Sequence, residues 1–312
     1  AWWLVMIALA KLGAVSVPTA TTLQPKDIAY RITRASIRMV IASAHDTSKF
    51  DSVRDDLDPV KDFVCVGEDR PGWINFWAGM SPASPEYVPL DGPRSTKIDE
   101  PLLMYFTSGT TGYPKIVTHT HAYSLAHRST AELWHDLKPN DVIWTITDTG
   151  WAKIAWGALF GQWHVGATIF VHQYAQFRPE RALSFLERYG ITVFCAPPTA
   201  WRMLILEDLK KHDLAELRRC TSAGEPLNPE VIEAWKRTIG LEINEGYGQT
   251  ESVLLIGTFA GMLPRYGSMG KPSPLFDISI IDNDLNPVPT GTEGDIAVRV
   301  KPDHPLGLFT GY

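Results

Sequence analysis

The regular alternation of β-rich runs and helical patterns from about Leu102 onward constrains the fold more than any other feature of this sequence. Such an order is typical of βα units on a mainly parallel sheet. The strands are expected at Leu102–Phe106, Val142–Thr147, Thr168–Val171, Val193–Ala196, Cys220–Ala223 and Leu241–Gly246. The helices are expected at Ala122–Trp134, Ile154–Trp163, Pro179–Tyr189, Thr199–Lys210 and Pro229–Ile239.

The first part of the chain shows the same alternation. We expect a helix to Leu12, a strand near Val15, a helix over Lys26–Ala35 and a strand over Met39–Ala42. The stretch Asp69–Asp99 is rich in Pro, Gly, Ser and Trp and lacks periodicity, so it is interpreted as an irregular connector.

Beyond Arg265 the pattern changes, because "FDISIID" and "GDIAVRV" alternate apolar and polar residues as half-buried antiparallel strands do. The sequence therefore predicts an α/β fold: two stacked βα subdomains with mainly parallel sheets, plus a small C-terminal antiparallel β unit. The expected parts are residues 1–100, 101–264 and 265–312.

Composition excludes several classes of function. The 312 residues carry a net charge of −6 without a Lys/Arg cluster, which disfavours nucleic acid and favours a small-molecule partner. The apolar start breaks at Lys11, so no membrane span is expected. The three cysteines, Cys65, Cys195 and Cys220, share no C-x-x-C spacing, which predicts a reducing compartment. Because Ala1 already lies in an apolar helical pattern, the chain is interpreted as beginning within a longer protein.

The loop "YFTSGTTGYPK", Tyr105–Lys115, follows one expected strand and precedes an expected helix. Backbone amides and a helix N-terminus can surround an anion in that setting, and glycine lets the backbone approach it closely. Hydroxyl groups and Lys115 add donors and charge, so phosphate is the expected ligand. A Walker A loop needs glycine before and Ser/Thr after the lysine, whereas Pro114 and Ile116 stand there.

These residues resemble the phosphate-binding loop of the acyl-adenylate-forming superfamily. "TSAGEPL", Thr221–Leu227, is similar to the family's adenine-contacting segment, and "NEGYGQTE", Asn244–Glu251, is similar to the motif that meets nucleotide and magnesium. "DTGWAKIAWG", Asp148–Gly157, is similar to the segment beside the acyl pocket. The resemblance covers residues 1–312 and is strongest to medium-chain acyl-CoA synthetases. It implies a fragment of the large N-terminal domain.

The resemblance implies a two-step ligation, in which a carboxylate attacks the α-phosphate of ATP and the thiol of CoA then displaces AMP from the acyl-adenylate. It assigns catalytic roles to Lys115, Thr250 and Glu251, and Mg²⁺ binding to Glu251 and Thr110. The nucleotide-binding residues that it implies are Thr107, Ser108, Gly109, Thr110, Thr111, Gly112, Pro114, Lys115, Gly224, Glu225, Pro226, Glu245, Gly246, Tyr247, Gly248, Gln249 and Thr250.

Acyl size is expected to depend on Gly248. Acetate-specific relatives carry tryptophan at the matching position, so glycine implies room for a medium-chain or aryl carboxylic acid. Trp151 is expected to line this pocket, although a packing role is the alternative. His119 and His121 have H-x-H spacing, but no carboxylate or cysteine accompanies them, so a metal site is disfavoured.

Three functions remain open at this point: an acyl-CoA synthetase, a truncated non-catalytic nucleotide-binding module, and an adenylation domain serving a carrier protein. In the resembling family, a ribose-binding aspartate, a hinge and a C-terminal lid domain with a catalytic lysine follow the segment that ends this chain, and the lid is expected to be absent here. The expected compartment is the cytoplasm in bacteria or the mitochondrial matrix in eukaryotes. Oligomeric state is left open.

Overall fold

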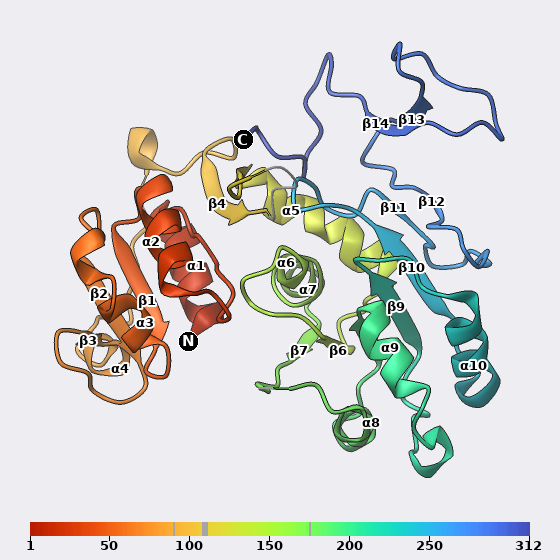
Figure 1. Ribbon diagram of the computed structural model, residues 1–312, viewed down its shortest axis with the longest axis horizontal. Helices are drawn as coiled ribbons and strands as arrows, with labels where there is room; N and C mark the ends of the chain where they lie inside the picture. The colour runs from red at the N-terminus through yellow and green to blue at the C-terminus, as the bar shows by residue number, and fades with distance from the viewer. Residues whose placement is uncertain (90, 108–111, 175) are drawn as a thin grey trace. The chain divides into compact units, whose positions relative to one another are not determined.

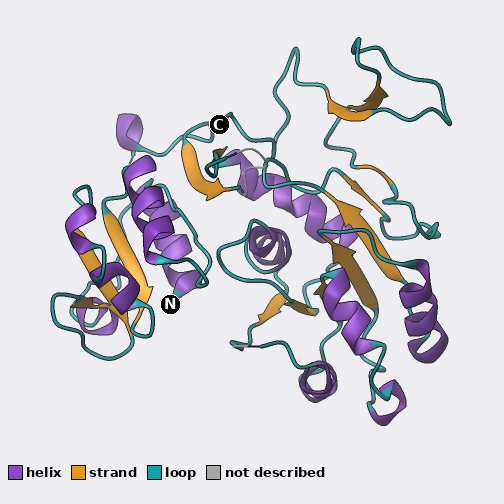
Figure 2. Ribbon diagram, in the orientation of Figure 1, coloured by secondary structure: helices purple, strands orange, loops and turns teal. Residues whose placement is uncertain are grey.

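The computed structural model describes residues 1–89, 91–107, 112–174 and 176–312, and of Arg94 only the main chain. The chain divides into two compact units. The first comprises Ala1–Thr118, Asp148–Trp151 and Gly311–Tyr312, and the second comprises His119–Thr147 and Ala152–Thr310. Strands and helices alternate along both (Figure 2).

The first unit contains a three-stranded parallel sheet in the order β1-β2-β3. Helix α2 buries Ile28 and Ile32, one turn apart, in a core shared with Val40 of β1 and Cys65 of β2. Burial of one face of an amphipathic helix on a sheet is the usual basis of a βα unit. The elements are α1 (Trp2–Leu12), α2 (Pro25–Arg34), β1 (Met39–Ser43), α3 (Thr47–Asp51), η1 (Arg54–Asp56), β2 (Asp62–Val66), β3 (Ile74–Asn75), α4 (Phe76–Met80), η2 (Gly92–Arg94), β4 (Pro101–Phe106) and β5 (Ile116–Thr120).

The second unit is built on a seven-stranded sheet in the order β12-β11-β10-β9-β8-β6-β7 (Figure 1). Strands β6 to β10 are parallel, and β11 and β12 add antiparallel pairs at one edge. The elements are α5 (Ala122–Ser129), η3 (Thr130–Trp134), β6 (Val142–Thr145), α6 (Lys153–Gly157), α7 (Phe160–Val165), β7 (Thr168–Phe170), α8 (Pro179–Arg188), β8 (Val193–Ala196), α9 (Pro198–Leu204), η4 (Leu209–Lys211), β9 (Arg219–Ala223), α10 (Pro229–Ile239), β10 (Ile243–Tyr247), β11 (Ile256–Gly257), β12 (Lys271–Pro272), β13 (Ile278–Ile281) and β14 (Asp295–Val298).

Each face of this sheet has its own core because successive side chains of a strand point to opposite faces. Trp144 and Phe194 pack with α8, α9 and α10 on one face. Their neighbours Ile143 and Val193 pack with η3 and the start of β7 on the other. The strand order reverses between β6 and β8, where ligands bind most often in open α/β sheets.

The expected α/β class with mainly parallel sheets is confirmed, and β13 and β14 form the expected antiparallel pair. Near Val15 the structure has an isolated bridge, Ser16 to Leu103, instead of a strand. The expected Asp69–Asp99 connector contains the short elements β3, α4 and η2. Strands β2 and β5 were not anticipated. The domain boundaries expected from sequence stay a prediction.

Two local expectations need correction. The helix expected over Ile154–Trp163 is two helices, α6 and α7, and Leu159 between them has φ −144° and ψ −90°. Gly157 explains part of the break, because a Cβ there would lie 2.2 Å from Thr145 Oγ1. Asn228 precedes α10 as expected, with Pro229 in the first turn, but its side chain makes no capping hydrogen bond.

Candidate active site

The loop after β4 is held together at its stem within the first unit. The Thr107 amide donates to the Lys115 carbonyl at 3.0 Å, closing the stem where the chain returns into β5. Lys115 is exposed, and its Nζ lies 4.7 Å from the centroid of the Tyr312 ring. The expected phosphate-binding residues at the tip lie outside the described residues: Ser108, Gly109, Thr110 and Thr111.

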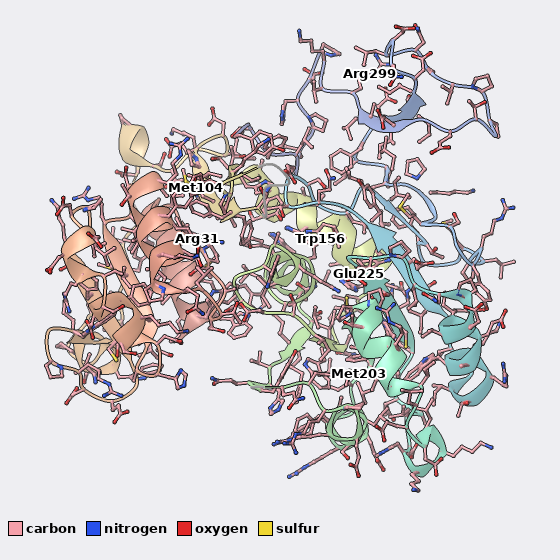
Figure 3. The ribbon with its side chains drawn as sticks, in the orientation of Figure 1. Arg31, Met104, Trp156, Met203, Glu225 and Arg299 are labelled. Carbon is pink, nitrogen blue, oxygen red and sulfur yellow. The ribbon has the colours of Figure 1, made fainter. Side chains whose placement is uncertain are left out.

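Helix α2 contacts both arms of this stem. The Tyr30 ring stacks on Tyr113 at 4.9 Å, and its hydroxyl donates to the Pro114 carbonyl at 3.3 Å. Arg31, labelled in Figure 3, places its guanidinium 4.8 Å from the centroid of the Phe106 ring on the other arm. Burial lowers the pKa of Arg31. The two arms of the stem are therefore positioned by neighbouring residues of one helix.

The expected adenine-contacting segment leaves the carboxyl end of β9 in the second unit. Gly224 has φ +114°, a conformation that glycine adopts without strain, and it turns the chain away from the sheet. Exposed Glu225, labelled in Figure 3, lies 3.4 Å from the Arg202 guanidinium. Pro226 and the N-terminus of α10 follow, so the sequence "GEP" is an exposed turn at a strand end, as expected.

Half-buried Lys153 and buried Glu245 stabilise this turn. Lys153 Nζ donates to the Ala223 carbonyl at 2.9 Å, and burial lowers the pKa of this lysine. The Glu245 carboxylate accepts from the Leu227 amide at 2.9 Å. Burial raises the pKa of Glu245, and that amide opposes the rise. Glu245 was expected to bind nucleotide. In the structure its carboxylate is bonded to the main chain of Leu227, directly after the turn.

Gly246 in β10 and Gly248, directly after this strand, admit two tryptophan rings. A Cβ on Gly246 would lie 2.6 Å from Trp134, and one on Gly248 would lie 2.2 Å from Cη2 of Trp156, which Figure 3 labels on α6. Trp156 is 5% exposed. The space beside Gly248, expected to be left for the acyl chain, is occupied at that point by the Trp156 indole. Tyr247, between the two glycines, is half-buried, and its carbonyl accepts a hydrogen bond from the Leu255 amide at 2.9 Å.

A tight turn carries Thr250 and Glu251. The Gln249 amide donates to Ser252 Oγ at 3.2 Å, and the Ser252 amide donates back to the Gln249 carbonyl at 3.2 Å. The side chain of Ser252 is buried, whereas Thr250 and Glu251 at the tip of the turn are half-buried. This arrangement leaves a hydroxyl and a carboxylate next to each other at the end of β10.

The main chain of this turn is bonded from two other segments. His119 Nε2 donates to the Thr250 carbonyl at 2.7 Å, and the Phe309 amide donates to the Glu251 carbonyl at 2.8 Å. His119 has no exposed surface, and burial lowers its pKa to about 4, with the Thr250 bond opposing the shift. A neutral imidazole is therefore expected at this place at physiological pH.

Glu251 is the carboxylate of the site that could bind a metal ion. Within residues 1–89, 91–107, 112–174 and 176–312, no group of three His, Cys, Asp or Glu side chains could hold an ion. Mg²⁺ commonly binds through one or two carboxylates together with phosphate oxygens and water. Glu251 fits that chemistry as a single half-buried carboxylate. Thr110, its expected companion, lies outside the described residues.

Trp151 belongs to the first unit and follows a turn that Asp148 organises. The Asp148 carboxylate accepts from the Gly150 amide at 2.8 Å, and its carbonyl accepts from the Trp151 amide at 3.2 Å. Trp151 is 57% exposed, which argues against the alternative of a packed core tryptophan. Its place in an acyl pocket stays a prediction.

Three residues of the site were not singled out from the sequence. Trp156 and Lys153 belong to the quoted segment "DTGWAKIAWG", and a lysine between apolar residues was a usable signal. For His119 the sequence favoured a position near the nucleotide or a satisfied surface pair over a metal ligand, and its bond to Thr250 depends on tertiary structure.

Comparison with known proteins shows the family. The model of the AMP-binding enzyme family matches residues 1–312, so the chain belongs to that family. The chain is 43% identical over 313 residues to the mitochondrial acyl-coenzyme A synthetase ACSM3 of Mus musculus, covering 100% of this chain and 53% of that protein. It is 39% identical to the human mitochondrial acyl-coenzyme A synthetase ACSM5 over the same shares. The chain thus spans about half the length of these curated relatives.

Solved structures show the same fold. The anthranilate CoA ligase AuaEII in complex with anthranoyl-AMP superimposes with a TM-score of 0.87 and 28% identity, over 97% of this chain and 57% of that one. A benzoate CoA ligase from Burkholderia xenovorans LB400 gives a TM-score of 0.79 and 25% identity, over 96% and 58%.

Proposed function

We propose that the protein containing this chain is an ATP-dependent acyl-CoA synthetase that activates a medium-chain or aryl carboxylic acid. The observation that carries the proposal is the turn after β10, which holds Thr250 and Glu251 half-buried with their carbonyls bonded to His119 and Phe309. Family membership and relatives named as acyl-coenzyme A synthetases support it.

The reaction brings two negatively charged groups together. An anionic carboxylate must approach a polyanion, so donors and cations must face the developing charge on the α-phosphate and the departing pyrophosphate. Thr250 can donate its hydroxyl to the α-phosphate or the acyl carboxylate. Lys115 is exposed at the loop stem and can neutralise the leaving phosphates. Glu251 would hold Mg²⁺, which supplies positive charge to the phosphate oxygens when bound.

The turn after β9 is proposed to hold the adenine. Its backbone is fixed by Lys153 at Ala223 and by Glu245 at Leu227, so the groups that line the base need not reorganise when it binds. The CoA thiol then attacks the acyl carbonyl of the adenylate and AMP leaves. CoA is thus proposed as the second substrate.

The acid is proposed to be medium-chain or aromatic. Trp151, in the segment expected beside the acyl pocket, is exposed and offers an apolar ring that suits an aromatic acid or a chain of limited length, whereas Trp156 itself fills the space beside Gly248. The solved ligases for anthranilate and benzoate are consistent with this class. Mitochondrial relatives support the matrix as the compartment in a eukaryote. None of the helices in the described ranges has the length and apolarity to cross a membrane.

Pyrophosphate exchange with acetate, hexanoate and benzoate in the full-length protein tests the proposal. Hexanoate or benzoate should exchange faster than acetate, and Glu251→Gln should lower the rate by about 100-fold. Glu233→Gln, which changes an exposed acid on α10, is the matched control. Faster exchange with acetate would overturn the assigned acid, and exchange unaffected by Glu251→Gln would overturn the assigned metal ligand. A protein that binds ATP without any exchange would be the non-catalytic module.

A further inference from the structure

A pocket that contains none of the quoted sequence motifs lies in the second unit, beyond the carboxyl ends of β6 and β7. Its volume is about 450 Å³, and its walls come from β6, from the loop after β7 and from the first turns of α8. Volumes of this order are usual for small-molecule sites. The lining residues that matter here are Trp144, His172, Phe177, Arg178, Arg181 and Phe185.

One side of the pocket is aromatic. The rings of His172 and Phe185 meet edge to face at 4.6 Å, and Trp144 lies 6.0 Å from Phe185 between centroids. Trp144 is also part of the main core of the unit, which fixes its position. A flat ligand would find preorganised ring surfaces on this side.

The other feature is positive charge. The guanidinium of Arg181 lies 5.2 Å from the Phe185 ring centroid. Burial lowers the pKa of His172, and the charge of Arg181 is the second cause of this shift. Neither Arg178 nor Arg181 has a carboxylate within ion-pair distance among the described residues. Among the described residues of the same unit, Arg128, Arg202, Arg218 and Arg299 do have one, whereas Arg188, Arg219, Arg237 and Arg265, like these two, do not. What distinguishes Arg178 and Arg181 is therefore their place in the pocket lining.

The start of α8 adds main-chain donors. This helix has ten residues, and its N-cap residue Arg178 makes no side-chain capping bond. Pro179 has no amide hydrogen, so the amides of Glu180 and Arg181 are the first donors without an intrahelical acceptor. The positive end of the helix dipole lies at the same place. Glu180 is not among the residues that line the pocket.

The pocket is separate from the proposed nucleotide site. In the strand order β10-β9-β8-β6-β7, four inter-strand steps separate the end of β10 from the end of β7. The end of β9, where the adenine is proposed to bind, is three steps from β7 and two from β6. With about 4.8 Å per step, these separations correspond to about 19 Å, about 14 Å and about 10 Å along the sheet. A molecule in the pocket would therefore leave the turn with Thr250 and Glu251 accessible.

We propose that this pocket is a second small-molecule site, which binds a planar aromatic oxyanion. The ring packs on Phe185 and His172, with Trp144 behind Phe185, and a phosphate or carboxylate group is held by Arg178, Arg181 and the first amides of α8. Arginine suits both groups because its planar donors pair with two oxygens at once. This inference does not depend on the proposed ligase activity.

Calorimetric titration of the full-length protein with phenyl phosphate tests the site, with benzoate as the carboxylate arm and inorganic phosphate as the arm without a ring. Phenyl phosphate should bind more tightly than inorganic phosphate. The double variant Arg178→Gln/Arg181→Gln should weaken its binding by about tenfold or more. Arg188→Gln, on the last turn of the same helix, should leave it unchanged. Benzoate bound more tightly than phenyl phosphate, with the same loss in the double variant, would assign the site to carboxylates.

Saturating ATP and Mg²⁺ should not displace phenyl phosphate from this site. Binding that ATP displaces and that the double variant retains would place the probe elsewhere and overturn the proposal. Equal affinities in wild type and double variant would do the same, as would the lack of any saturable binding of both ring-bearing probes. Thermal unfolding of each variant checks that the fold is intact.

Discussion

Gly112 in the loop after β4 and the two glycines of "GYG" at the end of β10 look alike in sequence but have different surroundings. Around Gly112 in the loop, no described atom lies within 4 Å of the place that a Cβ would take. Around Gly246 and Gly248, tryptophan carbons lie at 2.6 and 2.2 Å from that place. Gly112 thus has open space next to its backbone among the described atoms, whereas the space beside Gly246 and Gly248 is filled by the protein's own side chains.

This difference shows that glycine in a family motif does not always face the ligand. In β10 the missing side chains let α6 and η3 approach the strand through Trp156 and Trp134. The loop after β4 has no such packing at Gly112, so its described stem depends on Thr107, Lys115 and α2 for position. The two motifs should therefore respond differently to substitution.

Removal of the Trp156 ring should have the largest effect. Trp156→Ala deletes a buried side chain beside Gly248 and should lower the free energy of unfolding by about 3–5 kcal/mol. Denaturant unfolding measures this loss. Trp163→Ala, which removes a 39% exposed tryptophan from α7, is the control and should cost much less. If both variants were equally stable, the packing explanation of Gly248 would fail.

Adding a methyl group at Gly248 approaches the same contact from the other side. Gly248→Ala should destabilise the protein by about 1–3 kcal/mol, because the Trp156 ring and the Val253 carbonyl occupy the space. In Gly79→Ala the nearest atom would be at 3.9 Å in helix α4, so little change is expected. The cost of Gly248→Ala should fall in the Trp156→Ala background, and strict additivity in this double-mutant cycle would contradict direct contact.

Much of the fold was predictable because its signals are local. A short β-rich run located β8 over its full length, and Asn228–Pro229 located the start of α10. The strand order and the break between α6 and α7 were not predictable, since the break involves the approach of Gly157 to Thr145 in the tertiary structure. The same holds for the pairing of Trp156 with Gly248, which joins segments far apart in sequence.

For the site, the motifs predicted which residues gather at strand ends but not what holds them. The positions of Gly224 and Glu225 after β9 follow from strand and helix signals. The bonds of Lys153 to Ala223 and of His119 to Thr250 do not, because both partners come from other strands or helices. The four residues at the loop tip stay predictions.

The buried histidines near the turn should make stability depend on pH. Burial lowers the pKa of His119 to about 4 and that of His135 to about 3, and it lowers that of His127 well below the ordinary value. An unfolded histidine titrates near pH 6.5, so between about pH 6.5 and 4 the unfolded chain binds more protons than the native one. Stability is then highest above about pH 6.5 and falls as the pH drops, by about 1.4 kcal/mol per pH unit for each histidine.

Denaturant titrations at several pH values in this window would show the slope. His119→Asn should reduce it, whereas His304→Asn, at an exposed position of the same unit, should leave it unchanged. A stability that is flat over the window would contradict neutral buried imidazoles. The three histidines belong to the second unit. Low pH should therefore destabilise the unit that contains Gly246 and Gly248, and not the stem of the loop after β4.

The smallest effect is expected at the loop stem, where Tyr30 of α2 reaches Tyr113 and Pro114. Tyr30→Phe keeps the ring stack at 4.9 Å and removes only the hydrogen bond at 3.3 Å, so a loss of about 0.5–1 kcal/mol is expected. If the stem positions the phosphate loop, the KM for ATP of the full-length protein should rise about two- to fivefold with kcat unchanged. Tyr30→Leu also removes the stacking and should raise the KM further, and Tyr189→Phe on an exposed tyrosine of the second unit is the control. An unchanged KM in both Tyr30 variants would mean that ATP binding by the loop after β4 does not depend on the contacts of its stem with α2.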